Sequence, residues 1–265
     1  MTEDSAESTD DSSKSIEDAT REFYGEFFNE NSVAYLEKSA GSRWFRGLLQ
    51  SVLREIDPAT VRSVADFGCG IGHKTLILRE YFVDAEVSGF DFNPSAIDVA
   101  STAYGPKGIE FSTRDLAVES GSDGTRSEFD IVAAFDVLEH VDDWDALLDD
   151  ICDRSRRAVL ISVPVGRMRA YEVHIGHFRN YQKGEIEEAM RTRGFSPLKT
   201  VYAGFPFFSP ILREMTQVFF KNYSEVTSRP MSRIEAFGHR DWYFLFQYCS
   251  SKKRGDIFIG LFSRD

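Results

Sequence analysis

The stretch Asp66-Phe-Gly-Cys-Gly-Ile-Gly-His73, written DFGCGIGH, follows the apolar run VRSVA and contains three glycines at alternate positions. A glycine loop between a strand and a helix lets the backbone approach a ligand closely, because no side chain intervenes. It also points the helix N-terminus at that ligand. Ligands of open α/β sheets bind at this edge. The stretch therefore predicts a ligand site at the end of a buried strand.

The segments around this loop alternate between two periodicities. Short β-branched runs are followed by amphipathic segments, which is typical of a parallel sheet covered by helices on both faces. We therefore predict an α/β fold with a doubly wound, mostly parallel, seven-stranded sheet. The predicted strands cover 61–67, 85–91, 109–113, 129–135, 157–163, 196–202 and 256–263, and the predicted helices cover 73–83, a segment from Pro94, 142–155 and 183–193.

Composition divides the chain into regions. The 265 residues are 42% hydrophobic and 28% charged, which suits one globular domain. Residues 1–18 are rich in Ser, Thr and acids with almost nothing to bury, so we expect a disordered acidic tail there. We predict a single domain over 19–265, with N-terminal helices at 19–58, alternating strands and helices at 60–204, an aromatic-rich helical insertion at 205–254 and the last strand at 255–265.

The charge and the cysteine content limit the partners. A net charge of -12 would repel a phosphate backbone, so we expect a small-molecule partner and no nucleic acid. Cys69, Cys152 and Cys249 are odd in number and lack CxxC spacing, which argues against a disulfide framework or a zinc site. No apolar run approaches the roughly 18 residues of a membrane span, and the acidic N-terminus does not resemble an export signal. We expect a cytoplasmic protein with no membrane partner.

The glycine spacing distinguishes two nucleotide-binding patterns. In the dinucleotide fingerprint GxGxxG the third glycine comes one place later than Gly72. With Asp66 before the loop, the pattern hh(D/E)xGxGxG resembles the first motif of class I S-adenosylmethionine-dependent methyltransferases. The later segments VSGFDFNPSAIDVA, IEFSTRDL and FDIVAAFDVLEHV resemble further motifs of that family in the right order, so the resemblance covers about residues 60–200. It implies S-adenosylmethionine as the cofactor. It further implies that the N-terminal helices at 19–58 are a lid and that the region 60–204 is a cofactor-binding core.

The resemblance also implies roles for individual residues. Asp91 ends the next strand, where a carboxylate accepts both ribose hydroxyls, with an N-cap or turn role as the alternative. Phe92 would flank the adenine and Asp115 would accept from its amino group, with a plain loop acid as the alternative. Arg46 and Tyr35 are candidates to meet the cofactor's carboxylate. The predicted cofactor-binding residues are Asp66, Gly68, Cys69, Gly70, Gly72, Asp91, Phe92, Asp115, Leu116, Phe135 and Arg46.

Three histidines lie where a catalytic base is needed. A neutral His suits proton removal from an acceptor hydroxyl. His140 follows the fourth strand, and His174 and His177 follow the fifth, although each also suits a structural hydrogen-bonding role. Arg179 is a candidate for an acidic substrate group or for an ion pair with Glu172. The spacing HxxH lacks an evident third ligand, so we predict no metal.

These features together predict an enzyme. The fourth strand ends in FDVLEH and not in the D/N/S-P-P-Y/F/W motif that the family uses on base or amide nitrogens. We predict methyl transfer to a small or medium organic acceptor, most simply on oxygen. The alternatives are an NAD-dependent oxidoreductase, and a methyltransferase-like protein that binds the cofactor without catalysis.

Overall fold

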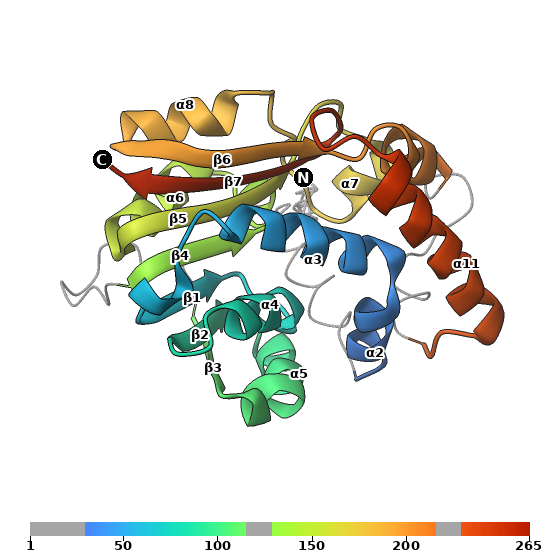
Figure 1. The fold of residues 1–265 in the computed structure, drawn as a ribbon, viewed down its shortest axis with the longest axis horizontal. Coiled ribbons are helices and arrows are strands. Elements are labelled where there is room, and N and C mark those ends of the chain that lie inside the picture. The colour runs from blue at the N-terminus through green and yellow to red at the C-terminus, as the bar shows by residue number, and fades with distance from the viewer. Residues whose placement is uncertain (1–29, 115–128, 216–228) are drawn as a thin grey trace, which may run out of the picture.

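The fold centres on one seven-stranded sheet. The computed structural model describes residues 30–114, 129–215 and 229–265, so the predicted tail at 1–18 lies outside them. The strand order is β3-β2-β1-β4-β5-β7-β6 (Figure 1). Strands β1 to β5 are parallel, and β7 is antiparallel to both of its neighbours. The predicted fold class is confirmed. The strands are β1 (Ser63–Phe67), β2 (Glu86–Asp91), β3 (Ile109–Thr113), β4 (Phe129–Phe135), β5 (Ser155–Pro164), β6 (Phe195–Ala203) and β7 (Ile257–Arg264).

Helices cover both faces of the sheet because its central strands are apolar on both sides. In β1, Val64 and Ala65 are fully buried and point to opposite faces. One face packs against α3 (Ala40–Leu53) and α4 (His73–Tyr81), and the other against α6 (Trp144–Arg154) and α8 (Glu185–Thr192). The first acids of the predicted helix 142–155 precede α6, where the Asp143 side chain caps it by accepting from the Ala146 N–H.

The order of the strands places the ligand site. From β1 the chain passes outward through β2, α5 (Pro94–Tyr104) and β3, and β4 then lies on the other side of β1. Ligands of doubly wound sheets bind where the strand order reverses, outside the carboxyl ends of the strands. The glycine loop 68–72, Asp91 and the segment 136–140 all follow such strand ends, at β1, β2 and β4 respectively.

The segments before β1 and after β6 pack together. Helix α2 (Glu30–Lys38) leads into α3, whose Trp44 and Leu48 are 1% exposed. Helix α11 (Arg233–Phe244) lies beside α3 at one end of the molecule (Figure 1). Its His239 Nδ1 accepts from the Ala40 N–H at 3.2 Å. The helical insertion is thus confirmed over its described part, whereas the lid at 19–58 stays a prediction. The remaining short elements are η1 (Pro58–Thr60), η2 (Gly105–Lys107), η3 (Leu138–His140), α7 (Ala170–His174), η4 (Phe207–Leu212) and η5 (Leu245–Cys249).

Within the described ranges, no helix is both long enough and apolar enough to span a bilayer.

Candidate active site

The glycine loop has a backbone that only glycine adopts readily. Gly68, Gly70 and Gly72 have φ of 71°, 53° and 76°, all in the left-handed region. A Cβ at Gly72 would lie 2.6 Å from Phe111 Cζ, and one at Gly68 would overlap the Val137 side chain. At Gly70, by contrast, no atom of the described chain lies within 4 Å of an added Cβ. Gly68 and Gly72 therefore serve packing, whereas Gly70 faces open space.

Asp91 fixes the shape of this loop. Its Oδ2 accepts from the Gly70 N–H at 2.7 Å and its Oδ1 from the Asn93 N–H at 2.9 Å. The carboxyl is buried, which raises its pKa, while the bonds from Asn93, Gly70 and Phe92 oppose the shift. The turn role weighed for Asp91 is therefore present. Its grip on the ribose stays a prediction, as does the stacking of the partly exposed Phe92.

Asp66 has an unused acceptor beneath the loop. It is 1% exposed, and its Oδ2 accepts from Thr75 Oγ1 at 2.6 Å. Its Oδ1 is buried and has no hydrogen-bond partner among the described residues. Burial raises the pKa of this carboxyl to about 7, although Thr75 and Lys74 act in the opposite direction. A buried oxygen of this kind suits a cation or a donor from a ligand.

Sequence reasoning missed a charged corner at the end of β4. Asp136, at φ 57°, is the one non-glycine residue of the described chain with positive φ. Lys74 forms an ion pair with Asp136 and donates to the Phe135 carbonyl oxygen at 3.2 Å. Ser162 Oγ donates to Asp136 Oδ1 at 2.8 Å. Burial acts to raise the pKa of Asp136, but Lys74 and Ser162 bring it below its usual value, so the carboxyl is ionised. The available signals were an acid directly after an apolar strand and a Lys in the first turn of α4.

Two of the three predicted histidines meet beside this corner. The rings of His140 and His177 are edge to face, with centroids 4.6 Å apart. His140 Nδ1 lies 3.2 Å from the Gly176 carbonyl oxygen, and His177 Nδ1 lies 3.4 Å from Asn180 Oδ1. Burial, together with the His177 ring, lowers the pKa of His140 to about 3, and burial lowers the pKa of His177. Both rings are therefore neutral at pH 7.

Glu139 joins the pair and completes a set of possible metal ligands. One ligand atom each from Glu139, His140 and His177 lies within 4.8 Å of the others. The third ligand that the sequence lacked is thus supplied by Glu139. Its carboxyl is 1% exposed, and Oε2 has no hydrogen-bond partner in the described part of the chain. Burial, and then the Asp136 charge, raise its pKa well above the usual value, so Glu139 is protonated.

The remaining predicted residues occupy various positions. Phe135 is 3% exposed and packs edge to face against Phe45, and Cys69 is buried with its thiol pKa raised by that burial. Arg46 forms an ion pair with Glu80. His174 is exposed on α7 and lies outside the histidine pair. Asp115 and Leu116 lie outside the described residues.

The ion pair considered between Arg179 and Glu172 is not formed. The insertion supplies Arg213 as the partner of Glu172 instead. The guanidinium of Arg179 lies over the Trp144 ring, 5.7 Å from its centroid.

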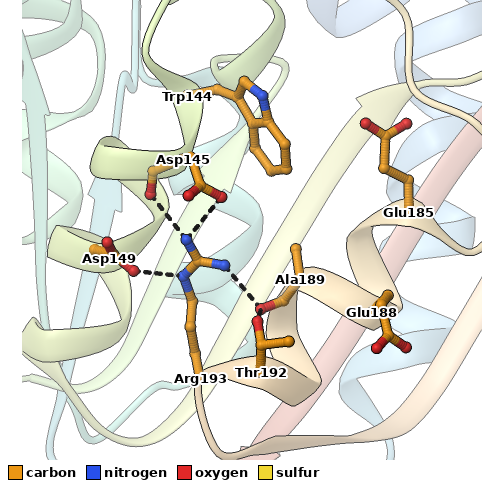
Figure 2. Close-up of a pocket in the computed structure, with 8 residues that line it drawn as sticks. All are labelled: Trp144, Asp145, Asp149, Glu185, Glu188, Ala189, Thr192 and Arg193. Atoms are coloured by element: carbon orange, nitrogen blue, oxygen red, sulfur yellow. Dashed lines mark hydrogen bonds and ion pairs between the residues drawn. The ribbon is translucent and has the colours of Figure 1, made fainter.

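A separate depression of about 530 Å³ lies between α6 and α8. Figure 2 shows Arg193 at its centre, with ion pairs to Asp145 and Asp149 of α6 at 2.8 Å and 2.7 Å. Burial acts to lower the pKa of Arg193, but the two carboxylates raise it. The Arg193 charge is therefore already paired with two carboxylates, and the interaction joins the end of α8 to α6.

The fold and the site define a class of protein. A sheet in this order, with a glycine loop after β1 and an acid ending β2, is the architecture of class I S-adenosylmethionine-dependent methyltransferases. The family model described as "Methyltransferase domain" matches residues 36–200. The chain therefore belongs to the methyltransferase domain family. An NAD-dependent oxidoreductase is no longer supported.

Relatives of known activity are distant. A ubiquinone biosynthesis O-methyltransferase of Stutzerimonas stutzeri (strain A1501) is 30% identical over 124 residues, covering 42% of this chain and 52% of that protein. A malonyl-acyl-carrier-protein O-methyltransferase of Acetivibrio thermocellus is 22% identical over 135 residues, covering 51% and 46%. The chain thus spans about half the length of the curated relatives it matches.

Solved structures share the fold over nearly the whole chain. Magnesium protoporphyrin IX methyltransferase from Synechocystis PCC 6803, with bound S-adenosylmethionine, superposes with a TM-score of 0.59 at 15% identity, covering 96% of this chain and 100% of that one. A phosphoethanolamine N-methyltransferase of Haemonchus contortus gives a TM-score of 0.61 at 19% identity, covering 95% and 60%. At these identities the likeness concerns the fold alone.

The residues present fit S-adenosylmethionine. The bare backbone at Gly70 leaves room for a ligand, and the unused Asp66 oxygen suits its ammonium group.

Proposed function

We propose that this enzyme transfers the methyl group to an oxygen of a small or medium organic acceptor, with the His140–His177 pair as the base. The observation that carries this proposal is the pair itself, two neutral imidazoles whose centroids lie 4.6 Å apart. His140 follows the end of β4, where Val137 packs on the glycine loop, and His177 comes from the chain after α7. Two O-methyltransferases among the partial relatives agree with oxygen as the target.

The cofactor would be held by the glycine loop, Asp66, Asp91 and Phe92. When bound, it supplies a methyl group already activated on a sulfonium, so the chain need not provide a nucleophile. The task of the chain is to align the acceptor with the methyl group, which can lower the activation free energy by roughly 7–11 kcal/mol.

The acceptor proton would pass to one imidazole of the pair. If Nδ1 of His177 donates to Asn180 Oδ1, the ring presents the Nε2 lone pair for this proton. The ionised Asp136 raises the pKa of both rings and so favours the imidazolium. Because His177 lowers the pKa of His140, the two neutral rings together take up one additional proton and not two.

We propose further that the pair works without a metal ion. A cation would need the Glu139 carboxylate as its third ligand, and it would have to displace the proton that burial favours on that group. Turnover should therefore survive dialysis against a chelator, and restoration of lost activity by Zn²⁺ or Mn²⁺ would contradict this.

The test of the function is an acceptor screen followed by substitution. Phenols, catechols and carboxylic acids are incubated with the enzyme, and S-adenosylhomocysteine formation is measured. His140→Ala and His177→Ala should each lower kcat by roughly 100-fold or more, with S-adenosylhomocysteine affinity and thermal stability as controls.

Wild-type turnover by both variants would remove the pair from catalysis. A loss confined to His174→Ala would move the base to α7. Turnover on amines alone would refute oxygen as the methylated atom.

A further inference from the structure

Helix α11 and the turn η5 that follows it carry apolar side chains on two opposite sides. The inner side packs against α3, where Phe246 is fully buried and its ring lies 5.5 Å from that of Trp44. A surface helix of a globular protein normally has only this one apolar side. Here the outer side also carries large apolar groups, namely Ile234 (86% exposed), Phe237 (58%), Phe244 (56%) and Tyr248 (71%). We call these four residues the outer apolar face.

These side chains form a surface and are not scattered. Ile234 and Phe237 are three positions apart in a helix, which makes them neighbours. The rings of Phe244 and Tyr248 lie 5.1 Å apart. Phe237 and Phe244 are seven positions apart, about two turns along the same side of the helix. Exposed apolar groups gathered in this way mark an interaction site.

The segment that carries the outer apolar face is rich in basic residues. Residues 229–254 contain six Arg and Lys but only two carboxylates, in a chain of net charge -12. Both carboxylates are paired, Glu235 with Arg229 and Asp241 with Arg240 at 3.6 Å. Asp241 is four positions after Phe237 and so lies on the same side of the helix. The Arg240 guanidinium lies 4.2 Å from the centre of the Phe237 ring. The unusual charge of this segment therefore borders the exposed apolar groups. The exposed basic residues are Arg229, Arg233, Arg240, Lys252, Lys253 and Arg254.

We propose that α11 docks on an anionic lipid bilayer, with the outer apolar face at the boundary of headgroups and acyl chains. An apolar face flanked by Lys and Arg is the pattern that binds such surfaces, because the burial of apolar side chains and the attraction of cations to anionic lipids both contribute to the affinity. A second copy of this chain fits less well, since a twofold interface would bring the same basic segment against itself. The expectation of no membrane partner rested on the lack of a spanning run, which a surface helix does not need.

Docking in this way would bring the active site near the membrane. Figure 1 places α11 and α7 at the same end of the molecule, and α7 follows the carboxyl end of β5. An apolar acceptor would then be met at the bilayer. The docking inference itself does not depend on methyl transfer.

The experiment is co-sedimentation of the full chain, without cofactor, with vesicles of phosphatidylcholine alone or mixed with phosphatidylglycerol. We expect binding to the mixed vesicles that falls as salt is raised. Phe237→Ser with Phe244→Ser should weaken it by about tenfold or more. Lys252→Gln with Lys253→Gln should weaken it by about twentyfold. The matched control is Val83→Ser, at a residue that is also 58% exposed but lies between α4 and β2.

Several results would overturn the inference. One is wild-type protein that stays in the supernatant with both kinds of vesicle. Others are double variants that bind the mixed vesicles as tightly as the wild type does, or loss of vesicle binding in Val83→Ser. A dimer that Phe237→Ser with Phe244→Ser dissociates, or an acidic protein bound in place of vesicles, would also overturn it. S-adenosylhomocysteine affinity confirms that each variant is folded, so failure here is distinguishable from failure of the proposed chemistry.

Discussion

Two glycines of the loop, Gly70 and Gly72, should respond differently to alanine, and the difference tests where the cofactor lies. At φ 53° and 76°, Gly70→Ala and Gly72→Ala each impose a left-handed conformation on a residue with a Cβ, at about 1–2 kcal/mol. At Gly72 the new Cβ also meets the Phe111 ring at 2.6 Å, and such overpacking costs about 1–3 kcal/mol more. Gly72→Ala should therefore lower the free energy of unfolding by about 2–5 kcal/mol, and Gly70→Ala by only about 1–2 kcal/mol.

Cofactor affinity should follow a different order from stability. The methyl of Gly70→Ala enters the open space that we assign to the cofactor, so S-adenosylhomocysteine should bind at least about tenfold more weakly, which is about 1.4 kcal/mol. The control is Gly105→Ala, at φ -51° with no described atom near its Cβ, which should leave both quantities nearly unchanged. Urea unfolding and titration calorimetry measure the two effects separately. Wild-type affinity in Gly70→Ala would refute the placement of the ligand against this loop.

The other predictions concern three carboxyl groups. Burial raises the pKa of Asp66 to about 7, so the folded state holds this proton more tightly than the unfolded chain does. The free energy of unfolding should therefore fall as the pH rises from about 4 to 7. Asp66→Asn should remove a few kcal/mol of this fall when urea unfolding is measured across pH, and an unchanged pH profile in the variant would contradict the prediction. Asp91→Ala leaves the Gly70 and Asn93 N–H groups without an acceptor and should weaken S-adenosylhomocysteine binding by about 1.5–3 kcal/mol in calorimetry; unchanged binding would exclude Asp91 from the site. Asp136→Asn removes a negative charge that raises the pKa of His140 and His177. The kcat should therefore fall, and the acidic limb of its pH profile should move to lower pH. A shift of that limb to higher pH would show that Asp136 does not raise the histidine pKa values.

What the sequence predicted depends on how local each feature is. The glycine loop and the acid that ends β2 could be identified because strand, turn and helix follow one another within a few residues. The sheet followed from the same alternation, and the placement of His140 and His177 after neighbouring strands followed from the shared strand edge. Those features needed no knowledge of distant side chains.

The features that were missed involve partners far apart in the chain. Lys74 and Asp136 are 62 residues apart, and no local pattern pairs them. Glu172 was expected to pair with the nearby Arg179, but its partner is Arg213, 41 residues away in the insertion. Phe135 packs edge to face against Phe45 of α3, and its contact with the cofactor stays a prediction.

Three locally unfavourable features gather beside the end of β4, and their clustering is itself an argument for function. Asp136 holds a left-handed backbone that costs a non-glycine residue about 1–2 kcal/mol. Lys74 places a positive charge in the first turn of α4, where the helix dipole favours a negative one. Glu139 is a buried carboxyl with an unused oxygen. A sequence selected for stability alone would avoid all three features. Their presence around the histidine pair is therefore expected if these residues were selected to bind ligands.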